Sequence, residues 1–163
     1  MKREAAKADP ILTHWRESVP NDRLAHLVKD VTRAFVRSLQ VRLAKDDIAF
    51  GHWTYLRILW ERDGLTQRQL SDEAGVMEPT THSALNAMES RGFIERKRLA
   101  GNAKNLHVFL TLEGRTLRDR LVPFEQAVSA LAVDGLTASE VGALRDTLLK
   151  LRENLSADPL LQS

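Results

Sequence analysis

The chain has 163 residues, 43% of them hydrophobic, which is enough for one domain with a buried core and short extensions. Its 24 Lys and Arg against 22 Asp and Glu give a net charge of +2, so binding to a polyanion must depend on positioned charges. It has no cysteine, which excludes disulfides, thiolate metal sites and thiol-based redox sensing. No apolar run approaches the length of a membrane span and no signal-peptide core is found, so we expect a cytoplasmic protein.

The N-terminal part of the chain has mainly helical patterns. Residues 1–20 are predicted to form an extension, with a short helix ending before Pro20. Asn21 is expected to cap a long amphipathic helix. Its apolar stripe consists of Leu24, Leu27, Val28, Val31, Phe35 and Leu39. A shorter helix is predicted from Gly51 to Glu61.

The next segment has the pattern of two short helices joined by a tight turn. Thr66 and Gln69 have the spacing of a capping box, which begins a helix, and Gly75 stands where that helix must end in a left-handed residue. Pro79 suits the first turn of the following helix, because its missing N–H costs nothing there. Leu85 and Met88 are predicted to form the inner face of this second helix, which ends at Gly92. The order is that of a helix-turn-helix.

A two-stranded ribbon is predicted directly after this unit. Residues 93–98 form a strand candidate, and Leu106, Val108 and Leu110 alternate inward on a second one, with a turn at Gly101-Asn102. From position 91 to 104 there are five Lys or Arg residues and one acid, a local net charge of +4. An isolated basic hairpin is more often a solvated surface, but one placed after a helix-turn-helix indicates a wing that contacts DNA.

The C-terminal part is again helical. A long helix is predicted from Thr111, with Pro123 inside it and Gly135 at its end. Thr137 and Glu140 form a second capping box, which begins a last helix. Its apolar positions are Val141, Leu144, Leu148, Leu151 and Leu155. The terminal helices exceed what one small module needs, so we expect a second copy of the chain to cover their apolar stripes, although packing within a monomer is the alternative.

The expected fold is mainly α with a small β-ribbon: a winged helix-turn-helix with dimerisation helices at both ends. The expected regions are an extension (1–20), a DNA-binding domain (48–110), dimerisation segments (21–47 and 111–155) and a tail (156–163). The outward side of the second helix is small and polar, which lets it approach phosphates and base edges. The candidate DNA contacts are Gln67, Arg68, Thr80, Thr81, His82, Ser83, Asn86, Arg96, Arg98 and Lys104.

The sequence contains none of the short motifs that would indicate an enzyme, such as a P-loop, G-x-S-x-G or H-E-x-x-H. No two of its five histidines have the i, i+4 spacing of a helical metal pair, and we expect neither a metal nor a cofactor. The alternative to DNA binding is a winged-helix module for protein–protein assembly without a small-molecule effector. Such interfaces favour apolar anchors, which the polar second helix lacks.

Three motifs resemble the MarR (multiple antibiotic resistance regulator) family of winged-helix transcription factors. The family pattern L-T-x-x-x-L-(x)3-hydrophobic-G-V is matched by Leu65-Thr66, Leu70 and Ala74-Gly75-Val76. Its L-E-x-x-G-hydrophobic-hydrophobic-x-R is matched by Met88-Glu89, Gly92-Phe93-Ile94 and Arg96, and its L-T-x-x-G by Leu110-Thr111 and Gly114. The resemblance covers about residues 21–155. One departure is the wing tip, where Asn102 and Lys104 replace the usual Asp and Arg.

The resemblance implies a homodimer that binds a pseudo-palindromic operator, usually as a repressor. It also implies release by a small aromatic carboxylate or its conjugate, bound between the dimerisation helices and the DNA-binding domain. The candidate lining residues are Trp15, His26, Arg33, Phe35, His52, Trp53 and Tyr55. The alternative is that these aromatic residues belong to the core and the histidines to the surface.

Overall fold

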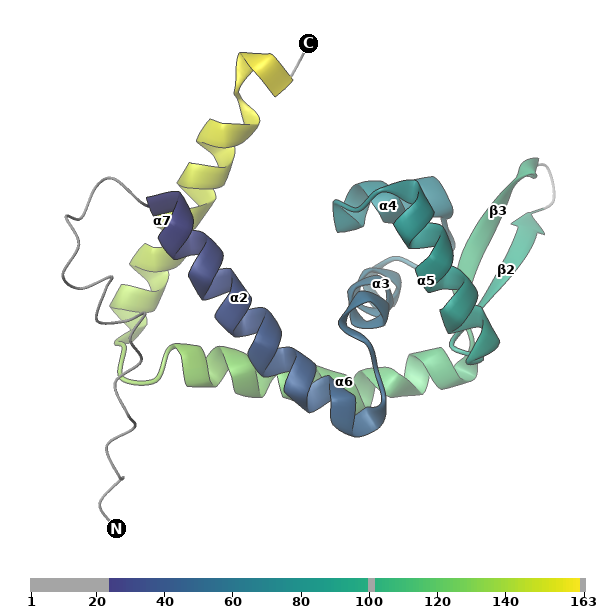
Figure 1. The fold of residues 1–163 in the computed structure, drawn as a ribbon, viewed down its shortest axis with the longest axis horizontal. Coiled ribbons are helices and arrows are strands. Elements are labelled where there is room, and N and C mark those ends of the chain that lie inside the picture. Colours follow the sequence, from purple (N-terminus) through teal and green to yellow (C-terminus); the bar gives the residue numbers. More distant parts are fainter. Residues whose placement is uncertain (1–23, 100–101, 162–163) are drawn as a thin grey trace. The chain divides into compact units, whose positions relative to one another are not determined.

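The computed structural model describes residues 24–99 and 102–161, with the side chains of 102–104 excepted. Its elements are α2 (Leu24–Leu43), η1 (Ala44–Asp46), α3 (Phe50–Glu61), β1 (Leu65–Thr66), α4 (Gln67–Ala74), α5 (Glu78–Ser90), β2 (Ile94–Leu99), β3 (Asn102–Leu110), α6 (Leu112–Ala132), α7 (Ala138–Ser156) and η2 (Pro159–Leu161) (Figure 1). The mainly helical fold with a small antiparallel sheet is as predicted. Trp15 and the predicted helix before Pro20 lie outside the described residues.

Contacts divide the chain into two compact units, residues 1–124 and 125–163, which we describe separately. The first contains the helix-turn-helix and the sheet. The second contains the end of α6 and the last helix, α7, which begins at the predicted capping box: the Thr137 hydroxyl accepts from the Glu140 N–H, and the Glu140 carboxylate accepts from the Thr137 N–H. Within residues 24–99 and 102–161, no helix is both long and apolar enough to cross a membrane.

The sheet has three strands in the order β1-β3-β2, all antiparallel, rather than the two-stranded ribbon expected. The additional strand β1 is only two residues long and pairs Leu65 with Val108. A strand this short has no periodicity from which to predict it. Val108 and Leu110 point inward as predicted, but Leu106 is exposed because β3 continues there past the end of β1, as part of the projecting β2–β3 hairpin (Figure 1).

The helix-turn-helix begins and ends where the sequence predicts. Thr66 and Gln69 form a complete capping box at the start of α4, and Gly75 ends that helix with a positive φ of 62°. Pro79 lies in the first turn of α5, and Leu85 and Met88 are fully buried on its inner face. The capping box, the left-handed glycine, the proline and the apolar spacing therefore locate this unit in the sequence.

The start of α6 is fixed against the chain that leaves α5. The Thr111 N–H donates to the Phe93 carbonyl at 3.1 Å, and the indole N–H of Trp60 donates to the Gly114 carbonyl at 2.8 Å. Gly114 packs so closely that a β-carbon built on it would lie 2.0 Å from the Phe93 carbonyl oxygen. Asp63 closes the junction, since its carboxylate accepts from the N–H of Leu110 at 2.9 Å and from the Arg115 guanidinium at 2.7 Å.

Candidate nucleic-acid interface

The outward face of α5 has small polar side chains. Thr80, His82, Ser83 and Asn86 are all exposed, whereas Leu85 and Met88 on the opposite side are buried. The helical period of 3.6 residues produces this division, and the buried face anchors the helix so that the polar face is held in place. On α4, the first helix of the helix-turn-helix, Arg68 is exposed and Gln67 is half-buried.

Thr81 does not belong to this face, and its prediction as a base contact is wrong. Its side chain is completely buried. Its hydroxyl oxygen accepts from the Ser71 hydroxyl at 2.8 Å and lies 2.9 Å from the Tyr55 hydroxyl. Buried hydroxyl groups require such partners, because each unpaired one costs the full loss of its hydration. The three hydroxyls, which we call the hydroxyl cluster, therefore tie α3, α4 and α5 together.

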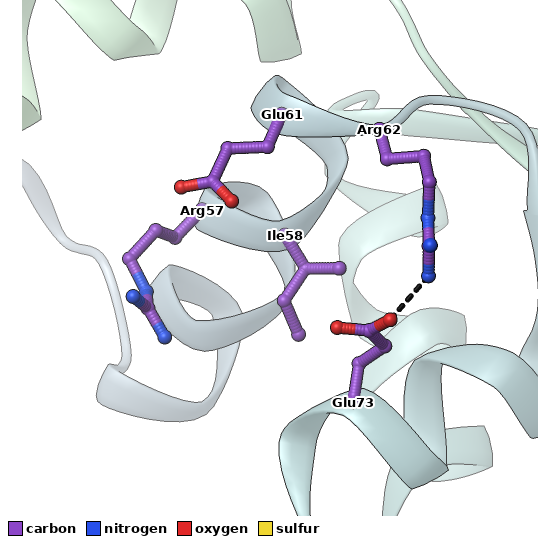
Figure 2. Close-up of a pocket in the computed structure, with 5 residues that line it drawn as sticks. All are labelled: Arg57, Ile58, Glu61, Arg62 and Glu73. Carbon is purple, nitrogen blue, oxygen red and sulfur yellow. Dashed lines mark hydrogen bonds and ion pairs between the residues drawn. The ribbon is translucent and has the colours of Figure 1, made fainter. Parts of the chain in front are cut away.

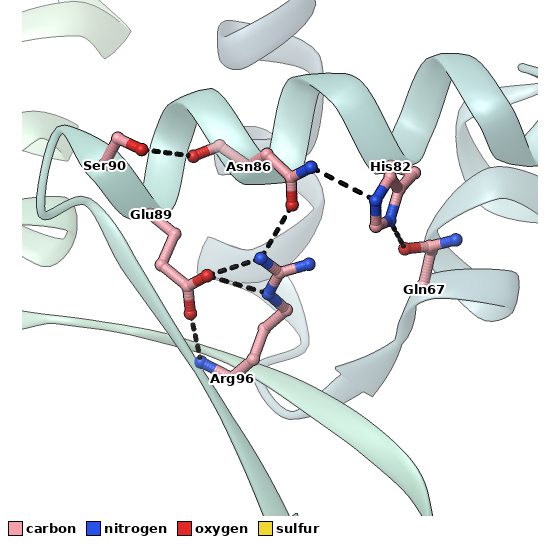
Figure 3. A network of polar contacts seen from close by, with 6 residues as sticks. All are labelled: Gln67, His82, Asn86, Glu89, Ser90 and Arg96. Atoms are coloured by element: carbon pink, nitrogen blue, oxygen red, sulfur yellow. Dashed lines mark hydrogen bonds and ion pairs between the residues drawn. The ribbon is translucent and has the colours of Figure 1, made fainter.

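A polar network runs over the exposed face from α4 to β2 (Figure 3). The Arg96 guanidinium donates to the Asn86 Oδ1 atom at 2.7 Å and to the Glu89 carboxylate, with Nε at 3.0 Å. Asn86 Nδ2 lies 3.1 Å from His82 Nε2, and His82 Nδ1 lies 3.1 Å from Gln67 Oε1. Four of the ten predicted DNA contacts are thus joined by hydrogen bonds.

Glu89 anchors this network and was not among the predicted site residues. It accepts from the Arg96 side chain and, at 3.1 Å, from the Arg96 backbone N–H. Hydrogen bonds from Arg96 hold the pKa of the Glu89 carboxyl below its ordinary value, against the opposing effect of burial. The sequence could have indicated this pair, because Glu89 and Arg96 both belong to the motif L-E-x-x-G-hydrophobic-hydrophobic-x-R.

The basic residues of the hairpin do not all face solvent. The Arg96 side chain is only 18% exposed and points toward α5, so it lies beneath the exposed face of the helix rather than at the tip of the hairpin. Lys97 pairs with Glu95 on the same strand. Arg98 is exposed, as a phosphate contact requires, and the Lys104 side chain lies outside those described.

The predicted effector residues that the structure describes do not form one site. Trp53 and Tyr55 are buried in the core, Trp53 edge-on to Trp60 with ring centroids 5.6 Å apart. On α2, Phe35 shares the face of Leu24, whereas His26 and Arg33 lie roughly 160–180° around the helix from them. The prediction of one common lining was therefore wrong for these residues, because Trp53 and Tyr55 belong to the core and the α2 residues face opposite sides of their helix.

His52 is half-buried at the start of α3, and its Nδ1 atom is buried without a hydrogen-bond partner. Burial lowers the pKa of this imidazole, the nearby Arg91 guanidinium lowers it further, and Asp47 partly opposes both. Arg91 and Asp47 form an ion pair with each other at 2.9 Å.

The free energy of unfolding should therefore fall as the pH drops below about 6.5, the ordinary histidine value. In this range the unfolded chain binds a proton at His52 and the folded chain does not, so acid favours unfolding. We expect His52→Gln to remove this contribution, so that the stability of the variant relative to the wild type rises as the pH falls. Urea unfolding of both proteins across this range measures the difference, and parallel pH curves would contradict the prediction.

A cavity of about 370 Å³ lies between α3 and α4, and none of the described residues predicted to bind an effector lines it. It is lined by Arg57, Ile58, Glu61, Arg62 and Glu73, and Figure 2 shows the ion pair of Arg62 with Glu73 on one side of it. Four of these five side chains are charged. The cavity therefore lacks the apolar walls that sites for aromatic ligands usually have.

Comparisons with known proteins agree with this arrangement. Residues 51–106 match the MarR family. The chain is 26% identical to the HTH-type transcriptional regulator TtmR of Methylorubrum extorquens over 84% of its own length and 69% of that protein. A putative MarR family regulator from Listeria monocytogenes, solved in complex with a 26mer DNA, is 26% identical with a TM-score of 0.77, covering 84% of this chain and 91% of that one.

The transcriptional regulator SlyA has the same fold, with a TM-score of 0.78 and 24% identity, covering 87% of this chain and all of that one. The proteins matched are named as transcriptional regulators and not as enzymes. Residues 51–106, which match the MarR family, thus lie in the winged helix-turn-helix of the first unit, and the proteins to which the chain is similar are transcriptional regulators.

Proposed function

We propose that the protein is a homodimeric repressor that binds a pseudo-palindromic DNA operator, with α5 in the major groove and the β2–β3 hairpin beside it. The exposed polar face of α5, backed by a fully buried apolar face, is the observation that supports this most directly. In this proposal residues 48–110 bind DNA and segments 21–47 and 111–155 form the dimer. Half-site centres would lie about 10 bp apart, since two recognition helices of a dimer enter the groove one turn apart.

Two exposed apolar stripes support the dimer. On α2, Leu24, Leu27, Val28, Val31 and Phe35 follow helical spacing, and each is 39–52% exposed. On α7, the apolar residues at 141, 144, 148, 151 and 155 repeat at alternating steps of three and four. This is the spacing of helices that pack against other helices, and a second copy of the chain would cover both stripes.

Replacing Val31 with Glu should prevent dimerisation, because it places a charge in the middle of the α2 stripe. Light scattering of the wild type at micromolar concentration should give twice 18.4 kDa, and the variant should give 18.4 kDa. Lys29→Glu is the matched control: it also adds a negative charge to an exposed position of α2, but away from the stripe. A monomeric wild type would rule out the dimer.

The hairpin contact predicts a dependence of DNA affinity on salt. The operator can be selected with the purified protein from a pool of random duplexes. Arg98→Ala should then reduce the slope of log affinity against log salt by about one unit for each protomer, the effect of one lost phosphate contact. Arg118→Ala, which removes an exposed arginine from α6, should leave the slope unchanged. If no duplex is enriched at low or moderate salt, a protein–protein role replaces DNA binding.

Release by a small aromatic carboxylate is a further part of the proposal, though not at the set of residues named from the sequence. To release DNA, such a ligand must favour a different spacing of the two recognition helices, because equal affinity for both states shifts nothing. A preference of about a hundredfold, or about 2.7 kcal/mol, would produce a practical switch. Titrating benzoates, salicylates and cinnamates into the operator complex tests this, and unchanged operator affinity throughout would remove the effector from the proposal.

A further inference from the structure

The directions of the hydrogen bonds that join Arg96, Asn86, His82 and Gln67 in Figure 3 can be assigned from Arg96, because a guanidinium only donates. The group of Asn86 that faces Arg96 at 2.7 Å must therefore be its oxygen. The amide nitrogen of Asn86 then faces His82, and as a donor it requires an acceptor at His82 Nε2. This assignment follows from chemistry and does not depend on distinguishing nitrogen from oxygen in the amide.

The tautomer of His82 follows from the same chain of contacts. If Nε2 accepts, the proton of the neutral ring is on Nδ1, and this N–H donates to Gln67 Oε1 at 3.1 Å. Glu89 fixes the origin of the chain, since it holds the Arg96 guanidinium through Nε and receives the Arg96 backbone N–H. Arg96, a residue of β2, thereby determines which hydrogen-bond donors and acceptors α5 has available for DNA.

We infer that Arg96 is a positioning residue for DNA recognition, which sets the orientation of the Asn86 amide and the Nδ1–H tautomer of His82. The inference rests on the proposed function of α5 as the helix that reads DNA. With one lone pair of Oδ1 used by Arg96 and one N–H used by His82, Asn86 retains one lone pair and one N–H. This is the pair of groups with which an asparagine recognises the N6 and N7 atoms of adenine.

The base read by Asn86 is therefore adenine, and the nearly buried Arg96 acts on it without touching DNA. His82 has both ring nitrogens occupied and supports the Asn86 amide rather than reading a base. Gln67 retains both N–H groups of its amide, because only its oxygen is used by His82. It can donate these to a base edge or a phosphate near the start of α4.

The tautomer can be measured without DNA. Nitrogen–proton correlation spectra of the imidazole rings, recorded where the rings are neutral, distinguish the two forms, and comparison with His82→Gln assigns the signals of His82. The wild type should have Nδ1–H. Arg96→Met, which removes the donors, should release the ring to adopt Nε2–H, and Arg96→Lys, which keeps a donor, should restore Nδ1–H. Arg98→Met is the matched control and should leave the tautomer unchanged.

Selection from random duplexes supplies the second measurement. Arg96→Met and Asn86→Ala should each lose about tenfold of the discrimination for adenine at the same operator position, as expected for one bidentate base contact. Arg98→Met should weaken binding to all sequences and keep the adenine preference. An Nε2–H tautomer in the wild type overturns the positioning role of Arg96 even if the protein binds DNA. A wild type with Nδ1–H that binds no duplex instead overturns the proposed function and the adenine preference together.

Discussion

Gly114→Ala in α6 should destabilise the protein much more than Gly51→Ala in α3. The added β-carbon would lie 2.0 Å from the Phe93 carbonyl oxygen and 3.0 Å from the Phe93 carbonyl carbon, and backbone atoms cannot move aside as a flexible side chain can. We expect a loss of about 3 kcal/mol in the free energy of unfolding, at the upper end of the range for overpacked sites. Thermal unfolding should show a fall in Tm of about 10 °C.

Gly51→Ala is the matched control, because it makes the same change in a helix of the same unit where nothing lies within 4 Å of the new β-carbon. Alanine there should be neutral or should stabilise the protein by about 0.5–1 kcal/mol, since it restricts the unfolded chain more than glycine does. Equal Tm values for the two variants would show that α6 can shift away from Phe93. The junction would then not fix the start of α6.

The second large effect is the loss of stability that we expect when the buried Thr81, but not its exposed neighbour Thr80, is replaced by valine. Thr81→Val keeps the shape of the side chain but removes the hydroxyl that Ser71 and Tyr55 share, so both lose a buried partner. We expect a loss of about 2 kcal/mol in the free energy of unfolding, the cost of leaving buried polar groups unsatisfied. Tyr55→Phe removes only one member of the hydroxyl cluster and should cost about 1 kcal/mol.

Thr80→Val makes the same chemical change one residue earlier, on the exposed face of α5. It should change the free energy of unfolding by no more than about 0.5 kcal/mol. It should instead alter operator binding. Denaturant unfolding and operator binding, measured for both variants, give the comparison. A stable Thr81→Val protein with altered base preference would return Thr81 to the DNA contacts and contradict the structural assignment.

Much of the helix-turn-helix was determined by the sequence, because its signals are local. The capping box at Thr66, the left-handed Gly75 and Pro79 at the start of α5 each depend on hydrogen bonds or backbone angles within a few residues. The apolar faces follow from the helical period in the same way. The short strand β1 could not be predicted, since it exists only by pairing with residues more than forty positions away.

The hydrogen-bond partners of the polar residues were decided only by tertiary structure. Thr81 lies four residues before Leu85 and seven before Met88, so helical spacing places it on the buried face. Its polarity suggested the opposite, and only the hydroxyls of Tyr55 and Ser71, brought by two other helices, make its burial favourable. Arg96 likewise counts as a wing charge in the sequence, but its hydrogen bonds to Glu89 hold it toward α5. Local hydrogen bonds and apolar periodicity can be read along the chain, whereas the partner that satisfies a polar side chain is known only once distant segments meet.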